Sequence, residues 1–198
     1  MAKRRKKKVE RIVPLSPGPL PERLLRRLSD HGLLFTDASR LRHGGLAAIL
    51  YRTAHAEPEI FTCTVPAIGS NELELQAAVF GLAQAARLFA GQRFTLFSDN
   101  LDAITRLTRC KERGIAQDKQ LASFFPSLVF EALLQCAALS WIPGHGRCRG
   151  NALADQHARL AAEGEDVNSH EESRIFVLPI SSNLTLSTEE KGGLSTLD

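Results

Sequence analysis

Apolar residues in the middle of the chain fall into short runs that predict five β-strands. Runs at 33–36, 44–52 and 59–65 follow one another closely, and the last two are separated by the hairpin-length connection TAHAEP. Two further runs lie at 93–98 and 137–142. The first three strands are expected to pair antiparallel, whereas the last two need crossover connections and therefore parallel pairing.

Helical periodicity fills the gaps between these runs. Apolar residues recur at helical spacing between Leu75 and Phe89, and shorter helices are predicted at 101–110, 119–135 and 151–163. Pro126 is expected either to start the ordered part of the third helix or to kink it, and Asn151 is the predicted N-cap of the last. The order βββαβααβα predicts an α/β fold, in which a mixed five-stranded sheet carries helices on both faces.

The two ends of the chain differ from the middle in composition and charge. Residues 1–30 hold ten Lys or Arg against three acids and are rich in proline, whereas residues 163–198 hold eight acids against two Lys or Arg. Like charges that bury nothing favour disorder. We therefore predict a disordered basic arm over 1–30 with at most one short helix, a catalytic domain over 31–163, and a flexible acidic tail over 164–198.

Composition also excludes several classes of protein. No apolar run approaches the roughly 18 residues of a membrane span, and no apolar segment follows the basic N-terminus as in a secretory signal. The four cysteines show no C-x-x-C spacing, which favours reduced thiols over a disulfide framework or zinc site. We expect a cytoplasmic monomer without a membrane partner, or a nuclear one if the host is eukaryotic, because of the basic run.

Four carboxylates stand where predicted elements begin or end. Asp37 and Asp99 end the first and fourth strands, Glu74 lies near the start of the first long helix, and Asp155 lies one turn into the last. Strand ends that follow crossovers gather at one edge of an α/β sheet. Converging carboxylates repel one another unless cations balance them, and their hard oxygen atoms are the ligands that Mg²⁺ prefers. Two such ions would suit the displacement of a phosphoryl group.

Four motifs in this order resemble the type 1 ribonuclease H family: TDAS (36–39), ELQAA (74–78), SDN (98–100) and GHGRCRGNALAD (144–155). The last motif is most similar to the ribonuclease H domains of retroelement reverse transcriptases and their cellular relatives. The resemblance spans residues 31–163. It implies a ribonuclease H-like fold and an endonuclease that cuts the RNA strand of RNA/DNA hybrids with two Mg²⁺ ions, for which Mn²⁺ can substitute. A polymerase partner is an open question.

The resemblance also implies roles for individual residues. Asp37 would bridge both ions, Glu74 would hold one ion and touch a ribose 2′-hydroxyl, Asp99 would bind the ion that activates water, and Asp155 would complete the other ion's shell. His145 would help protons or product leave. The predicted nucleic-acid contacts are Ser39, Ser70, Asn71, Asn100, Arg147, Arg149 and Asn151.

Other interpretations of these residues stay open. Glu74 follows Asn71 by three positions and could belong to a capping box, which would leave Glu72 as the rival metal ligand. Asp99 could also cap the helix at 101–110. The alternative functions are a nucleic-acid-binding module of the same fold that does not cut, and a different metal-dependent nuclease on this fold. The segment CKERGIAQDK at 110–119 is too short for the basic protruding helix of well-known family members, so the basic arm is a candidate substitute for it.

Overall fold

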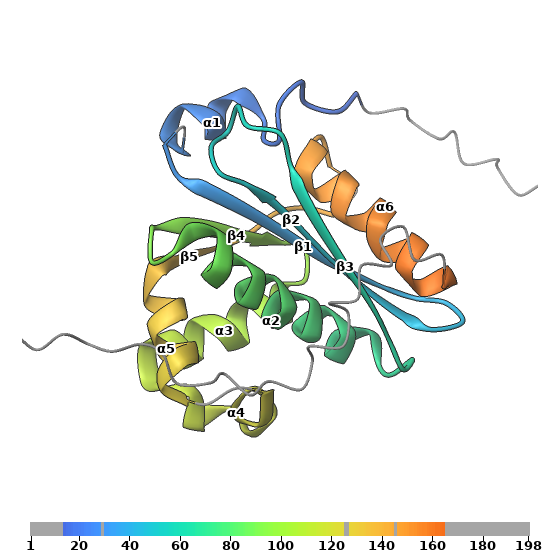
Figure 1. Cartoon of the computed structure of the whole chain (residues 1–198), viewed down its shortest axis with the longest axis vertical. Helices are drawn as coiled ribbons and strands as arrows, with labels where there is room; N and C mark the ends of the chain where they lie inside the picture. The colour runs from blue at the N-terminus through green and yellow to red at the C-terminus, as the bar shows by residue number, and fades with distance from the viewer. Residues whose placement is uncertain (1–13, 29, 125–126, 145, 165–198) are drawn as a thin grey trace, which may run out of the picture. The chain divides into compact units, whose positions relative to one another are not determined.

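A five-stranded mixed sheet forms the centre of the domain, in the order β3-β2-β1-β4-β5 (Figure 1). The computed structural model describes residues 14–28, 30–124, 127–144 and 146–164. The strands are β1 (Gly32–Arg40), β2 (Gly44–Tyr51), β3 (Glu59–Val65), β4 (Phe94–Ser98) and β5 (Ala137–Trp141). β2 pairs antiparallel with β1 and β3, whereas β4 pairs parallel with β1 and β5. This confirms the predicted mixed sheet.

The helices agree with the prediction between β3 and β4 and after β5, but they differ from it between α3 and β5. They are α1 (Glu22–Leu28), α2 (Ser70–Phe89), α3 (Leu101–Arg113), α4 (Lys119–Phe124), α5 (Ser127–Cys136) and α6 (Arg149–Glu163), and a 3₁₀ turn at Ile115–Gln117 follows α3. The single helix expected over 119–135 is thus two helices. The boundary between them falls at residues 125 and 126, which lie outside the described residues.

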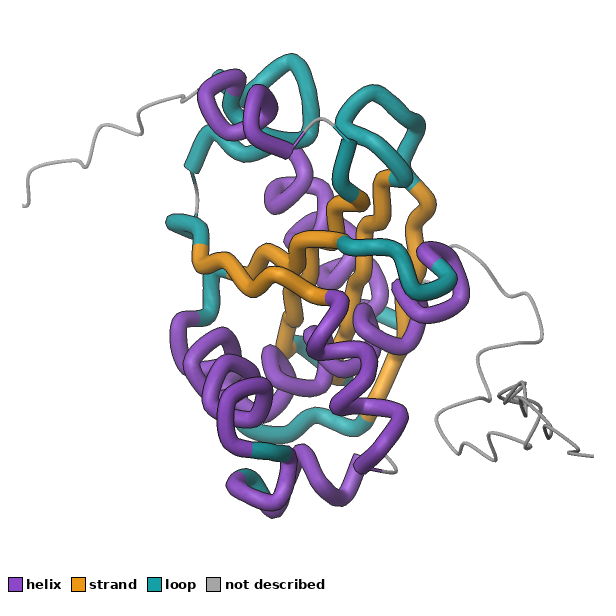
Figure 2. Tube along the Cα trace, turned by 90° about the vertical axis from the view of Figure 1, so that its left-hand side faces the viewer, coloured by secondary structure: helices purple, strands orange, loops and turns teal. Residues whose placement is uncertain are grey.

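Helices cover both faces of the sheet, as predicted (Figures 1 and 2). Alternate residues of each strand point to opposite faces, so neighbouring residues join different cores. Leu34 belongs to a core shared with α2, α3 and α5, whereas Leu33 and Phe35 belong to a second core shared with α6 and α1. β1 and β4 are therefore buried on both faces, which positions the ends of these two strands firmly.

Two glycines allow α6 to lie close to the sheet. A Cβ atom at Gly45 of β2 would collide with the carbonyl oxygen of Ala158, and one at Gly150 would come within 2.5 to 2.6 Å of the Phe35 ring. Only glycine avoids both clashes without moving the helix. The close approach brings the first turns of α6, including Asp155, over β1.

Part of the N-terminal arm is ordered and packs against the domain. Leu20 is fully buried in the second core, and Leu24, Leu25 and Leu28 of α1 pack against the same cluster. The prediction of a disordered arm was therefore wrong for residues 14–28, although α1 is the one short helix expected there. The lysine and arginine run and the acidic tail lie outside the described residues, apart from Gly164. Within the described part of the chain, no helix is long and apolar enough to cross a membrane.

Candidate metal and active site

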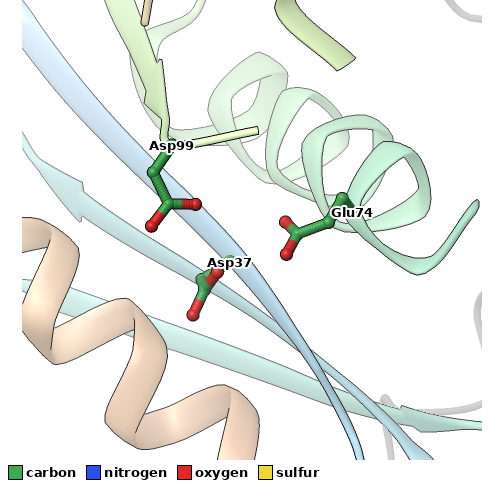
Figure 3. Close-up of side chains that lie close together, drawn as sticks. All are labelled: Asp37, Glu74 and Asp99. Atoms are coloured by element: carbon green, nitrogen blue, oxygen red, sulfur yellow. The ribbon is translucent and has the colours of Figure 1, made fainter. Parts of the chain in front are cut away.

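Three acidic side chains from three different elements meet at one point. Asp37 lies on β1, Glu74 one turn into α2, and Asp99 directly after β4. Each offers a carboxylate oxygen, and these oxygens all lie within 4.8 Å of one another. Figure 3 shows the three carboxyl groups turned toward a common centre.

The sheet topology explains why residues so distant in sequence converge. Phe35 of β1 is paired with Phe97 of the parallel strand β4, so Asp37 and Asp99 both lie two residues beyond the same pair. The carboxyl ends of parallel strands form the edge at which α/β proteins usually place their ligands. α2 packs across β1 and β2, which brings Glu74 to this edge.

Burial and mutual repulsion disfavour the charged forms of these acids. Burial, reinforced by the charges of Asp99 and Asp155, raises the pKa of Asp37 from 3.8 to about 8. Burial, followed by the charges of Asp37 and Asp99, raises the pKa of Glu74 from 4.5 to about 9. The backbone N–H of Ala38 hydrogen-bonds to both groups and opposes these pKa shifts, but it is the weaker effect. A nearby cation would reverse the preference by favouring the ionised carboxylates.

The donor set fits a hard divalent cation. Oε2 of Glu74 is buried and has no hydrogen-bond partner, although a buried carboxylate oxygen normally has one. Asp37 is only 6 % exposed. An ion such as Mg²⁺, which takes carboxylate oxygens as ligands, would satisfy the unpartnered oxygen and cancel the repulsion. Asp37, Glu74 and Asp99 are therefore the residues that could hold such an ion.

Asp155 extends this cluster from the other face of the sheet. It lies on α6, and its side chain is close enough to Asp37 to hydrogen-bond with it. The three-oxygen group described above does not include it. All four predicted metal ligands thus converge, three of them tightly and the fourth beside Asp37. His145 lies outside the described residues.

The side chain of Asn151 hydrogen-bonds to one of the three clustered acids. Nδ2 of Asn151 donates to Oδ2 of Asp99 at 3.2 Å, and Asn151 is only 5 % exposed. The prediction that Asn151 caps α6 was wrong, because the helix begins at Arg149 with Cys148 as its N-cap. Asn151 instead lies in the first turn and positions a carboxylate.

A hydrogen-bonded pair of asparagines joins the start of α2 to the start of α3. The N-cap of α3 is Asn100, whose Oδ1 accepts from the backbone N–H of Ala103 at 2.9 Å, so the prediction that Asp99 caps this helix was wrong. Nδ2 of Asn100 donates to Oδ1 of Asn71 at 3.4 Å. Two of the predicted nucleic-acid contacts therefore lie side by side next to the acids.

The structure also shows which of Glu74 and Glu72 belongs to the acidic cluster. Glu72 is exposed, and its carboxyl group folds back over Gly69, the N-cap of α2. No side chain caps α2, so Glu74 does not act in a capping box. Glu74, and not Glu72, reaches the acidic cluster.

The remaining predicted nucleic-acid contacts lie on separate elements of the domain. Ser39 follows Asp37 by two residues on β1 and is half-buried, whereas Ser70 is exposed at the start of α2. Arg147 and Arg149 are exposed before and at the start of α6, and Nη1 of Arg149 donates to the Pro17 carbonyl at 3.1 Å. Their contacts with nucleic acid stay predictions.

Two side chains next to the site, Trp141 and Ser98, make hydrogen bonds that were not predicted from the sequence. Nε1 of Trp141 donates to the Asp99 carbonyl at 2.9 Å, and Oγ of Ser98 accepts from the backbone N–H of Asn100 at 3.1 Å. Ser98 is visible in the SDN motif, but its role depends on the bend after β4. Trp141 ends β5, and nothing in its local sequence indicates that its indole turns toward β4.

Comparison with known protein families gives a match over most of the chain. The family model described as RNase H matches residues 30–163. No curated protein sequence matches the chain.

Several solved structures share the fold. RNase H1 from the halophilic archaeon Halobacterium salinarum is 18% identical with a TM-score of 0.51, and the match covers 68% of this chain and 98% of that one. LC11-RNase H1, isolated from compost by a metagenomic approach and solved in complex with an RNA/DNA hybrid, is 12% identical with a TM-score of 0.51, covering 67% and 97%. A foamy viral protease-reverse transcriptase in complex with double-stranded DNA is 13% identical with a TM-score of 0.55, covering 71% and 97%. At these identities the likeness shows the fold alone.

Proposed function

The chain belongs to the RNase H family, and we propose that it is an endonuclease that hydrolyses the RNA strand of RNA/DNA hybrids with two divalent metal ions. The main support for this proposed function is the cluster of acidic side chains. Asp37, Glu74 and Asp99 bring carboxylate oxygens within 4.8 Å of one another, and one buried oxygen of Glu74 has no partner. Such carboxylate oxygens suit the divalent ions that promote hydrolysis of a phosphodiester.

In this proposal each of the four acids would help to hold at least one of the ions. Asp37 would contribute to holding both ions, Asp99 would help to hold the ion that activates the attacking water, and Asp155 would help to hold the other. Glu74 would help to hold one ion and would contact the ribose 2′-hydroxyl, the group that distinguishes RNA from DNA. Bound divalent ions lower the pKa of the attacking water and stabilise charge on the leaving oxygen. Asn151 keeps the Asp99 carboxylate in place through its hydrogen bond of 3.2 Å.

The substrate is proposed to lie over the same edge of the sheet. Asn71 and Asn100 are hydrogen-bonded to each other there, and amide groups of this kind bind phosphate and sugar oxygens. Ser39, Ser70, Arg147 and Arg149 are the further proposed contacts, and His145 is proposed to assist proton transfer or product release. LC11-RNase H1, which shares the fold, is solved with an RNA/DNA hybrid, which supports a hybrid as the substrate class.

A panel of matched duplexes tests the proposal. RNA/DNA, DNA/DNA and RNA/RNA duplexes of one sequence, labelled on either strand, are incubated with the protein in Mg²⁺, in Mn²⁺ and in EDTA. We expect cleavage of the RNA strand of the hybrid only, with none in EDTA. The Asp99→Asn variant should lose cleavage, whereas Asp102→Asn, whose side chain is 54 % exposed on α3, should retain it.

Other outcomes of this assay would distinguish the two alternative functions. Tight binding of the hybrid without cleavage in either metal would indicate a nucleic-acid-binding module. Cleavage of a DNA strand would indicate a different metal-dependent nuclease on this fold.

A further inference from the structure

An N-terminal segment, residues 14–20, crosses the beginning of α6; we call it the N-terminal strap. In Figure 1 the blue chain before α1 passes beside the first turn of α6. The strap lies outside residues 30–163, which the family model matches. Its contacts are therefore additions of this chain to the matched domain.

The strap is held by hydrogen bonds and by a buried leucine. The backbone N–H of Ser16 donates to the Arg147 carbonyl at 2.7 Å, and the Cys148 thiol donates to the Pro19 carbonyl at 3.2 Å. Leu20 is fully buried in the core that also contains Phe35 and Ala154. Polar and apolar contacts together fix the strap against the loop that leads into α6.

The strap supplies what α6 lacks at its N-terminus. The first backbone N–H groups of a helix have no partner within the helix, and a capping side chain usually satisfies one of them. The N-cap residue of α6, Cys148, makes no side-chain capping bond. Instead Oγ of Ser16 accepts from the N–H of Arg149 at 3.2 Å, and the Pro19 carbonyl accepts from the N–H of Gly150 at 2.9 Å.

Ser16 is arranged to serve as this distant cap. It is only 9 % exposed, and its hydroxyl donates to the Gly18 carbonyl at 2.7 Å. That bond directs the hydroxyl hydrogen away from α6 and leaves an oxygen lone pair for the Arg149 N–H. The strap thus caps the helix from 133 positions away in sequence.

The start of α6 also carries residues of the active site. Asn151, two residues after Arg149, donates to the Asp99 carboxylate, and Asp155 faces Asp37 one turn later. Fraying of the first turn would release the Asn151 amide and shift Asp155. The capped turn therefore holds both residues in place.

We propose that the N-terminal strap is a remote N-cap that positions the first turn of α6 for the reaction, with Ser16 as the positioning residue. The kinetic part of this proposal rests on the proposed nuclease function, whereas its structural part does not. A strap that only covers apolar surface would act through Leu20 alone and would not need the Ser16 hydroxyl.

Amide hydrogen exchange on the full-length protein tests the capping directly. By residue-resolved NMR, the amides of Arg149 and Gly150 in the wild-type chain should exchange slowly, like amides in the interior of α6. Ser16→Ala should speed exchange at Arg149 about tenfold, the factor expected when a helix loses its N-cap acceptor. Ser16→Thr keeps an acceptor oxygen and should restore the slow rate. Ser123→Ala, which removes an exposed hydroxyl on α4, is the matched control and should change neither amide.

Kinetics on an RNA/DNA hybrid give the second measurement. Ser16→Ala should lower kcat about three- to tenfold and leave KM within about twofold, because the loss lies in placing Asn151 and Asp155 and not in binding the duplex. Ser16→Thr should recover the wild-type kcat.

Three results would overturn the proposal. They are fast exchange of Arg149 and Gly150 in the wild-type chain, unchanged exchange in Ser16→Ala, and a Ser16→Thr variant that behaves like Ser16→Ala. The wild-type measurement needs no variant, so it decides the question even if Ser16→Ala does not fold. If the wild-type protein cuts no hybrid, the proposed function fails, while the exchange rates still test the strap.

Discussion

Replacing Asp37 by asparagine should make the metal-free protein more stable while it removes the centre of the acidic site. In the folded chain burial and the neighbouring acids raise the pKa of Asp37 from 3.8 to about 8. Between these two pH values the folded state holds a proton that the unfolded state has released. Stability therefore falls as the pH rises through this window, and it falls no further above the folded pKa. Asparagine has nearly the same shape and no charge to lose.

The structure sets the size of the effect. At pH 7.5 the distance from the unfolded pKa of 3.8 is about 4 pH units, and at about 1.4 kcal/mol per unit the upper limit is about 5 kcal/mol. Because the repulsion that raises the pKa of Asp37 is shared with Asp99 and Asp155, and because a buried amide needs its own partners, we expect a gain of about 2–4 kcal/mol. For a domain of this size that corresponds to a rise in Tm of on the order of 5–10 °C.

Thermal unfolding in EDTA at pH 7.5, followed by circular dichroism, measures this gain. The control is Asp102→Asn on α3, which should stay within about 0.5 kcal/mol of the wild type because Asp102 is exposed. Adding Mg²⁺ should stabilise the wild type and narrow the gap, because the ion neutralises a repulsion that the variant lacks. A folded Asp37→Asn variant that melts at or below the wild-type temperature in EDTA would refute the electrostatic argument.

Three further predictions concern contacts of Asn151, Gly45 and Trp141. Asn151→Asp should lower kcat on a hybrid about 10- to 100-fold, since it replaces the donor to Asp99 with a repelling carboxylate; initial rates at saturating Mg²⁺ measure this. Gly45→Ala should destabilise the protein by about 1–3 kcal/mol in urea unfolding, since the new methyl group collides with the Ala158 carbonyl and pushes α6 off β2. Trp141, the single tryptophan, should change its fluorescence on addition of Mg²⁺ because its indole hydrogen-bonds to the Asp99 carbonyl, and the change should be absent in Asp99→Asn.

The acids were predictable because their positions depend on local patterns. Asp37 and Asp99 each follow an apolar run that is a candidate buried strand, and parallel pairing brings the ends of two such runs to one edge, although β1 itself continues to Arg40. Glu74 could be separated from Glu72 only through the family motif ELQAA, because both lie near the start of the same helix. The structure explains the choice, since Glu74 lies on the buried side of α2 and Glu72 on the exposed side.

The capping of α6 could not be read from the sequence. Asn151 looked like an N-cap because asparagine commonly caps helices, but the helix begins two residues earlier. The groups that satisfy the first N–H groups come from Ser16 and Pro19, and such contacts leave no periodic pattern near residue 149. For the same reason the proline-rich segment was predicted to be disordered. Its order depends on Leu20 entering a core built by residues far away in the chain.

Mn²⁺ binding shows whether Asp37, Glu74 and Asp99 form one site for divalent cations. Electron paramagnetic resonance measures the free Mn²⁺ that remains as the metal is titrated into the metal-free protein. We expect the wild type and Asp102→Asn to bind Mn²⁺ alike, and Asp37→Asn and Glu74→Gln each to lose this binding. Wild-type binding in both Asp37→Asn and Glu74→Gln, with each variant folded, would show that these acids do not form a cation site.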